Sequence, residues 1–214
     1  MTARDEVLNN IRTALGRAAG QLPAPLAAPA LRIPLSDRNL YTDLFVKKLE
    51  NLSGKTIVVR EPADVVPALA GILDGKRAVA SNAPFLETCG ITRLPEVQSG
   101  FTDGQALRTV CVEADIGITS ADYALAETGT FVMISSPKEA RLVSLLPPVH
   151  IAVFPRARIL ANLDELLGVL PLPAEQTSSM VLITGGSRTA DIEQILIRGV
   201  HGPGEVLAVI VENG

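Results

Sequence analysis

A chain of 214 residues with a net charge of −4 at pH 7 can form one sizeable domain, and it has no basic excess with which to bind nucleic acid. Aromatic residues make up only 3% of the chain, too few for the stacking platforms that bind single strands. No apolar run reaches the roughly 20 residues of a membrane span, and the acidic first turn is unlike a signal peptide, so we expect a cytoplasmic protein.

The composition also predicts the kind of core. Hydrophobic residues make up 47% of the chain, mostly Val, Ile, Leu and Ala, which suits parallel strands covered on both faces. The two cysteines, Cys89 and Cys111, are far apart and form no CxxC motif. They predict buried thiols rather than a disulfide, a zinc site or an iron–sulfur cluster, so we expect no cofactor on this chain.

The N-terminal segment reads as an arm. Residues 3–19 place Leu8, Ile11 and Leu15 on one helical face, and prolines then follow at positions 23, 25, 29 and 34. This proline spacing excludes a helix or a central strand, so the segment predicts an extended connector. We therefore divide the chain into a helical arm with its connector, residues 1–34, and an α/β domain, residues 35–214. The arm could pack on its own domain or mediate oligomerisation.

The first half of the domain reads as alternating helices and strands. Ser36 can cap a helix that ends at Gly54. A strand at 55–60, a helix near 63–73 and a strand at 77–81 predict a β-α-β unit with a right-handed crossover. Residues 107–120 predict one or two further strands.

The second half begins with a predicted antiparallel hairpin, residues 121–136, that turns at Glu127-Thr128-Gly129. Ser136, Pro137 and Glu139 then form a capping-box pattern for a helix that ends at Pro147. A strand at 149–154, a short helix at 162–169 and strands at 180–184 and 206–212 complete the domain. The fold class is therefore α/β, a mainly parallel sheet flanked by helices, with an N-terminal helical arm.

The stretch VLITGGSRTADIEQILIRGVHGPGE, residues 181–205, is the first candidate site. It reads as a strand, a turn at Gly185-Gly186 and a helix capped by Ser187 or Thr189. A helix N-terminus attracts anions, but Asp191 and Glu193 stand in the first turn and would oppose a phosphate. Walker and GxGxxG patterns are both absent.

Two interpretations of this stretch stay open. The helix start could neutralise itself and bind nothing. Alternatively, Ser187, Arg188 and Thr189 bind a small carboxylate or a partner chain, while Asp191 or Glu193 holds a hydroxyl, an amine or Arg188 itself. The second interpretation places a cleft beyond the carboxyl ends of the strands, where open parallel sheets bind ligands.

The other candidates are a glutamate and a histidine. Glu127 lies between apolar segments, followed by Thr128, Gly129 and Thr130, so partial burial could make it a general base or nucleophile; it could equally be a turn residue. His201 begins a tight Gly-Pro loop and could contact a ligand, or be structural. For His150, at the start of a strand, we favour a structural role.

Three stretches resemble a known family. GITSADYALAETGTFVMISSP, RLVSLLPPVHIAVF and ITGGSRTADIEQILIRGVHGPGEVLAVIVE are similar in order and spacing to the LUD domain, and specifically to its lactate-utilisation protein C (LutC) branch. The resemblance covers residues 36–214. It implies a fold similar to the sugar-phosphate isomerases and CoA-transferases, and it assigns motif positions, but not roles, to the candidates above.

The resemblance also implies a function. LutC-like proteins are expected to act with two iron–sulfur proteins that oxidise L-lactate to pyruvate, and this chain lacks the cysteines to hold those clusters itself. The chain would then bind a small organic acid or a partner, with Arg188 as the carboxylate contact and His201 as the proton acceptor. The alternatives are an independent transferase, isomerase or ligase acting on phosphate, CoA or folate ligands, and a non-catalytic adaptor. The sequence does not decide whether the isolated chain is an enzyme.

Overall fold

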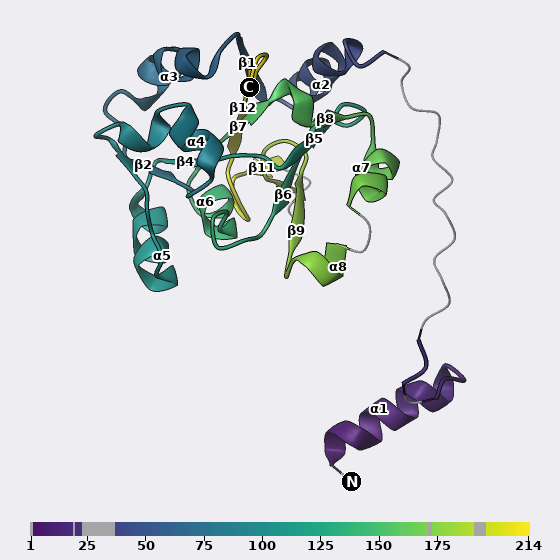
Figure 1. The fold of residues 1–214 in the computed structure, drawn as a ribbon. Helices are drawn as coiled ribbons and strands as arrows, with labels where there is room; N and C mark the ends of the chain where they lie inside the picture. Colours follow the sequence, from purple (N-terminus) through teal and green to yellow (C-terminus); the bar gives the residue numbers. More distant parts are fainter. Residues whose placement is uncertain (1, 19, 23–36, 171–172, 191–195) are drawn as a thin grey trace. The chain divides into compact units, whose positions relative to one another are not determined.

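The computed structural model describes residues 2–18, 20–22, 37–170, 173–190 and 196–214 (Figure 1). The chain divides into two compact units, Met1–Ala30 and Leu31–Gly214. In the first unit, helix α1 (Ala3–Ala14) begins with a capping box in which Thr2 and Asp5 each accept a hydrogen bond from the other's backbone amide. Its apolar residues Val7, Ile11 and Leu15 are at least half exposed. No helix among the described residues is long and apolar enough to cross a membrane.

The second unit is built on two larger sheets and has a separate two-stranded one, β10–β11. The helices are α2 (Leu40–Asn51), α3 (Val65–Leu73), α4 (Pro84–Thr88), α5 (Gly104–Glu113), α6 (Arg141–Leu145), α7 (Leu163–Val169) and α8 (Pro173–Gln176). The strands are β1 (Lys55–Val59), β2 (Ala78–Ala80), β3 (Val97–Gln98), β4 (Ile116–Thr119), β5 (Tyr123–Leu125), β6 (Thr130–Ile134), β7 (Val149–Pro155), β8 (Ile159–Leu160), β9 (Met180–Ile183), β10 (Arg188–Ala190), β11 (Leu196–Arg198) and β12 (Glu205–Val211).

The larger sheet is parallel throughout. Its six strands lie in the order β1-β12-β7-β4-β2-β3, and every neighbouring pair is parallel. A second, four-stranded sheet has the order β8-β5-β6-β9 and is mostly antiparallel. The predicted α/β class with a mainly parallel sheet is therefore confirmed, and the predicted hairpin at 121–136 is β5–β6.

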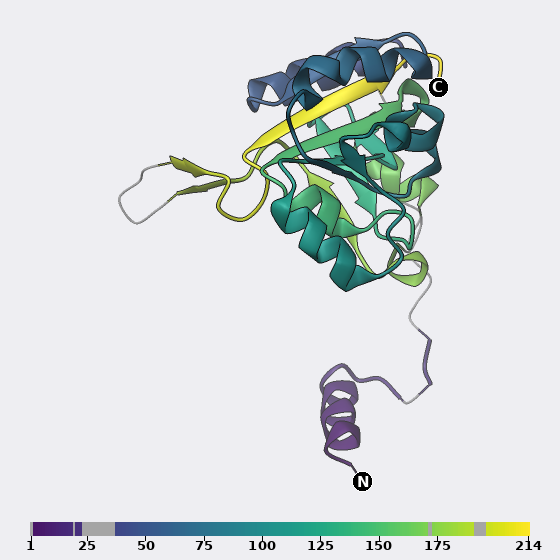
Figure 2. The same cartoon turned by 90° about the vertical axis from the view of Figure 1, so that its left-hand side faces the viewer.

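Both faces of the parallel sheet are covered, as its aliphatic strands require (Figures 1 and 2). Helices α3 and α4 pack on one face through Leu69, Leu73 and Leu86. On the other face, α2 and the second sheet share a core in which Phe45 meets Phe131 and Phe154 at ring-centroid distances of 5.8 and 5.7 Å. Cys89 and Cys111 are free and buried, as predicted; Cys89 lies in the cluster with α3 and α4, and Cys111 lies in a separate cluster on α5.

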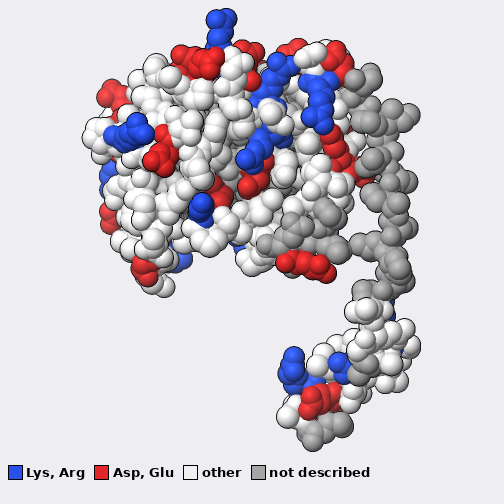
Figure 3. Space-filling model, in the orientation of Figure 1, with Lys and Arg blue, Asp and Glu red and all other residues white. Residues whose placement is uncertain are grey.

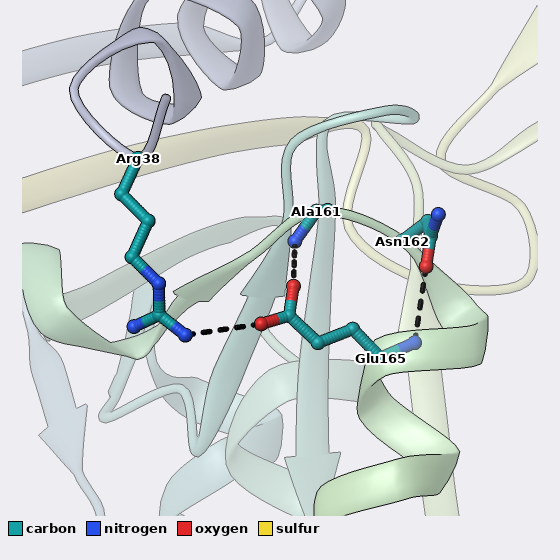
Figure 4. Close-up of polar contacts among 4 residues, drawn as sticks. All are labelled: Arg38, Ala161, Asn162 and Glu165. Atoms are coloured by element: carbon teal, nitrogen blue, oxygen red, sulfur yellow. Dashed lines mark hydrogen bonds and ion pairs between the residues drawn. The ribbon is translucent and has the colours of Figure 1, made fainter. Parts of the chain in front are cut away.

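Polar contacts tie α2 to α7 (Figure 4). Asn162 caps α7 by accepting a hydrogen bond from the amide of Glu165 at 3.0 Å. The Glu165 carboxylate accepts one from the Ala161 amide at 2.6 Å and pairs with Arg38 at 3.1 Å. On the face drawn in Figure 3, acidic and basic side chains are interspersed over the second unit.

Two local predictions need correction. Residues 107–120 were predicted to supply one or two strands, and they contain one strand, β4, because helix α5 occupies Gly104–Glu113. Asp103 caps α5 by accepting from the amides of Gln105 and Ala106, and Leu107 and Cys111 form its buried face four residues apart. Helix α6 begins at Arg141 rather than at Pro137, because the Glu139 carboxylate turns into the core instead of closing the capping box.

Candidate functional site

An open cleft brings four of the predicted motif residues together: Gly185, Ser187, His201 and Gly202. Its volume is about 220 Å³, and we call it the 184–203 cleft. It is lined by Ser144, Leu145, Val181, Leu182, Ile183, Thr184, Gly185, Ser187, His201, Gly202, Pro203 and Val206. The polar groups in this lining come from the end of α6, from the turn after β9 and from the loop before β12.

The cleft lies at the opposite edge of the parallel sheet from the one we expected. Gly204, just before β12, donates to the carbonyl of Pro148, just before β7, at 3.0 Å. The loop of His201 therefore lies at the amino ends of these two parallel strands. The prediction failed because β9, which leads into the motif, belongs to the second sheet and not to the parallel one.

Backbone contacts hold the two sides of the cleft loop together. Gly186 lies so close to the other side that a Cβ atom would stand 2.4 Å from the carbonyl oxygen of Gly204. Ser187 donates its amide to the Pro203 carbonyl at 2.7 Å, and its hydroxyl accepts from the His201 amide at 3.3 Å. These contacts place the exposed His201 beside Ser187 at the mouth of the cleft.

The helix predicted after Ser187 is replaced by a two-stranded hairpin. Strand β10 pairs with β11 in the antiparallel register Arg188↔Arg198, Thr189↔Ile197 and Ala190↔Leu196. The β-branched pair Thr189 and Ile197 favours strands over helix. The hairpin extends away from the two sheets (Figure 2). Asp191 and Glu193 lie outside the described residues. Because β10 and β11 are strands, the argument against phosphate from a helix dipole at Ser187 does not apply.

Arg188 contacts a helix end rather than the cleft. Its guanidinium donates to the carbonyl of Leu52, the C-cap residue of α2. Arg198 reaches the hydroxyl of neighbouring Ser53 at 3.4 Å. Carbonyls at a helix C-terminus lack intrahelical partners and attract cations, which explains why both arginines of the hairpin lie here. Arg188 is not among the residues that line the cleft.

The ETGT motif reaches the cleft through hydroxyl groups. Thr128 and Thr130 are linked at 2.6 Å between their Oγ1 atoms, and Thr130 is linked to Thr184 at 2.8 Å. Gly129 has a φ of +66°, and a Cβ atom there would stand 2.5 Å from the Leu49 amide nitrogen of α2. Glu127 is exposed, so its expected partial burial was wrong. Thr184, which we did not single out from the sequence, joins this motif to the cleft wall.

A second polar cluster, also missed from the sequence, lies at the carboxyl ends of β2 and β4. We call Ser81, Ser120, Asp122 and Glu139 the Glu139 cluster. Oε2 of Glu139 accepts from the Ser81 hydroxyl at 2.8 Å and from the Ser120 amide at 3.3 Å. Oε1 is buried and has no hydrogen-bond partner among the described residues. No local signal reveals this contact, because Ser81 is 58 residues away.

Burial raises the pKa of the Glu139 carboxyl to about 8; the two hydrogen bonds oppose this shift and the charge of Asp122 adds to it. Burial also raises the pKa of Asp122, which accepts from the Ile134 amide at 2.7 Å. Glu139 is therefore mainly a neutral acid at neutral pH. Glu139 and Ser81 are buried, at 6% and 3% exposure, whereas Ser120 and Asp122 are partly exposed.

His150 is a core residue. It is fully buried, its Nε2 lies 2.8 Å from the Thr119 hydroxyl, and its ring packs edge-on against Phe131. Its Nδ1 has no partner among the described residues, and burial lowers the pKa of the imidazole to about 4. These contacts agree with the structural role that we favoured.

The residues present do not fit an iron–sulfur cluster. The whole chain has two cysteines, and they lie in separate core clusters where burial raises the pKa of each thiol to about 11. Among the residues that the structure describes, no group of three or more His, Cys, Asp or Glu side chains could hold a metal ion.

Comparison with solved structures supports the fold. A DUF162 family protein from Deinococcus radiodurans matches with a TM-score of 0.61 and 18% identity, over 82% of this chain and 98% of that one. This likeness shows the fold alone. The predicted similarity to the CoA-transferases stays a prediction.

Comparison with sequences identifies the family. Lactate utilization protein C of Halalkalibacterium halodurans is 32% identical over 98% of both chains. An uncharacterized protein of Escherichia coli, YkgG, is 28% identical over the full length of both. The LUD domain family matches residues 42–211. The chain therefore belongs to the LUD-domain family.

Proposed function

We propose that this chain is a cytoplasmic lactate-utilisation protein that binds a small organic acid in the 184–203 cleft and acts with iron–sulfur proteins in the oxidation of L-lactate to pyruvate. The role in lactate utilisation is supported by similarity along the whole length to a lactate utilization protein C. Because its own cysteines do not fit a cluster, the proposal gives this chain no part in electron transfer.

The observation that carries the proposal is the cleft itself. At about 220 Å³ it is smaller than the roughly 300–1,000 Å³ of sites for drug-sized ligands, so it suits a molecule of a few heavy atoms. Val181, Ile183 and Val206 supply apolar surface, which suits a short carbon skeleton. Hydroxyls of Thr184 and Ser187 and the imidazole of His201 supply the polar contacts.

The cleft also offers backbone donors for a carboxylate. Among the described residues, no backbone hydrogen bond of the turns and loops uses the amides of Gly185 and Gly202. Backbone amides and a neighbouring imidazole are the groups that bind a carboxylate, and imidazole is also the usual proton acceptor near neutral pH. This arrangement replaces Arg188 as the expected carboxylate contact.

The test is thermal unfolding of the purified chain with L-lactate, pyruvate, phosphate, CoA and folate. A ligand at 100 times its Kd stabilises the folded chain by about 2.7 kcal/mol. We expect stabilisation by lactate or pyruvate and its loss in Gly202→Leu, because a Cβ there lies 3.7 Å from that of Ser187 and a longer side chain would fill the cleft.

The matched control is Gly71→Leu on α3, where an added Cβ meets nothing within 4 Å. This variant should keep the response to lactate. Stabilisation only by phosphate, CoA or folate would contradict the proposal and favour an independent enzyme. Stabilisation by none of the five would contradict the acid-binding role and leave docking of a partner protein.

A further inference from the structure

The three linked threonines suggest how the cleft would choose its ligand. Thr130 and Thr184 stand opposite each other, one step beyond the pair Phe131↔Ile183 of the β6–β9 ladder. Thr130 is 3% exposed and is held between Thr128 and Thr184, with oxygen–oxygen distances of 2.6 and 2.8 Å. Thr184 is exposed and lines the cleft. The linked hydroxyls therefore end at Thr184, an exposed residue in the wall of the cleft.

Each threonine hydroxyl has one hydrogen and two lone pairs. If hydrogen bonds run from Thr128 through Thr130 to Thr184, the hydrogen of Thr184 is free to donate. If they run the other way, Thr184 gives its hydrogen to Thr130, and its lone pairs are free to accept. Either atom of each pair can be the donor, so the two directions differ only by rotation about three C–O bonds.

We propose that the Thr130–Thr184 pair is the specificity determinant of the cleft and selects acids with an oxygen on the carbon next to the carboxylate, in both the 2-hydroxy and the 2-oxo form. The hydroxyl of a 2-hydroxy acid donates to Thr184, and the oxo group of a 2-oxo acid accepts from Thr184. The same residue thus serves both members of a redox couple without movement of a heavy atom. This inference rests on the proposed function, because it assigns the ligand of the same cleft.

Cross-strand threonine pairs also stabilise ordinary sheets, so the test needs a readout that a structural role would not change. The Kd values of L-lactate, pyruvate and propionate are measured by calorimetry on the wild-type chain. Propionate has the same carbon skeleton and no oxygen on that carbon. We expect lactate and pyruvate to bind about tenfold more tightly than propionate, the contribution of one hydrogen bond with both partners desolvated.

The variant Thr184→Val should bind all three acids with similar Kd, and Thr184→Ser should restore the preference. Thr130→Val, which leaves Thr184 without its buried partner, should weaken lactate and pyruvate binding while leaving propionate unchanged. Thr109→Val on α5 is the matched control, because within the part of the chain that the structure describes, the Thr109 hydroxyl donates only to the Gln105 carbonyl of its own helix. It should bind like the wild type.

The outcomes separate the two proposals. Equal binding of all three acids by the wild type, or a preference that survives Thr184→Val, would overturn the specificity role and leave the acid-binding cleft standing. A wild-type chain that binds none of the three would overturn the acid-binding role and this inference together. If the wild type preferred only lactate or only pyruvate over propionate, the proposal that Thr184 serves both the 2-hydroxy and the 2-oxo acid would be overturned.

Discussion

The two polar sites of the domain differ in position, in exposure and in how their groups are paired. The Glu139 cluster lies at the carboxyl ends of β2 and β4, and its glutamate is buried with one carboxylate oxygen that has no described partner. The 184–203 cleft lies at the amino ends of β7 and β12 and is open, and short hydroxyls, glycines and one histidine line it beside apolar side chains. A perturbed pKa therefore does not by itself identify a ligand site, because burial perturbs ionisation where ligands have least access.

The largest expected difference between the sites concerns two glutamates. With the pKa of Glu139 raised to about 8, the folded chain holds a proton that the unfolded chain has lost above about pH 4.5. The free energy of unfolding should therefore decrease by at most roughly 1.4 kcal/mol per pH unit as pH rises from 5 to 8. Glu139→Gln should abolish this decrease, as measured by urea unfolding at several pH values.

The matched control for Glu139 is Glu127→Gln in the exposed turn before β6. It should leave the pH dependence as in the wild type. The contrast between the buried and the exposed glutamate would fail if Glu127→Gln and Glu139→Gln changed the slope equally, or if Glu139→Gln left it unchanged.

The buried histidine, His150, should make the free energy of unfolding depend on pH in the opposite direction. Burial lowers the pKa of His150 to about 4, so between pH 6.5 and 4 the unfolded chain binds a proton that the folded chain does not. The free energy of unfolding should fall with decreasing pH over this range, again by at most roughly 1.4 kcal/mol per pH unit. In urea unfolding at several pH values, His150→Gln should reduce this loss of stability at acid pH, at some cost in stability at neutral pH. His201→Gln, at an exposed residue, should leave the loss unchanged. If the loss of stability at acid pH were the same in His150→Gln as in the wild type, other groups would have to cause it.

The smallest expected effect belongs to Arg188. Its exposed guanidinium contacts a carbonyl at the C-terminus of α2, so Arg188→Ala should lower the free energy of unfolding by less than about 1 kcal/mol. Because Arg188 does not line the cleft, the Kd of lactate should stay within about twofold of the wild type in calorimetry. A tenfold loss of affinity would restore Arg188 as the carboxylate contact and move the site toward the hairpin.

Local pattern predicted the candidate site only in part. Ser187 and His201 come together in the cleft because glycines and a proline close the loop that carries them, and these residues can be read from the sequence. Thr184 could not be singled out from the sequence, because it follows an apolar strand and belongs to no motif with a distinctive spacing. Its contact with Thr130 forms only when β9 pairs with β6 and places the two threonines opposite each other.

The sequence by itself determined the fold class, the aliphatic core, the hairpin at 121–136 and the family, because these follow from composition, from periodicity and from motifs that are continuous in the chain. Only the tertiary structure decided that residues after Ser187 form strands, that the cleft lies at the amino edge of the parallel sheet, and that Glu139 is a buried neutral acid. The physical reason is common to all three. Strand pairing and burial depend on contacts between residues far apart in the chain, such as Glu139 with Ser81, and no local pattern encodes them.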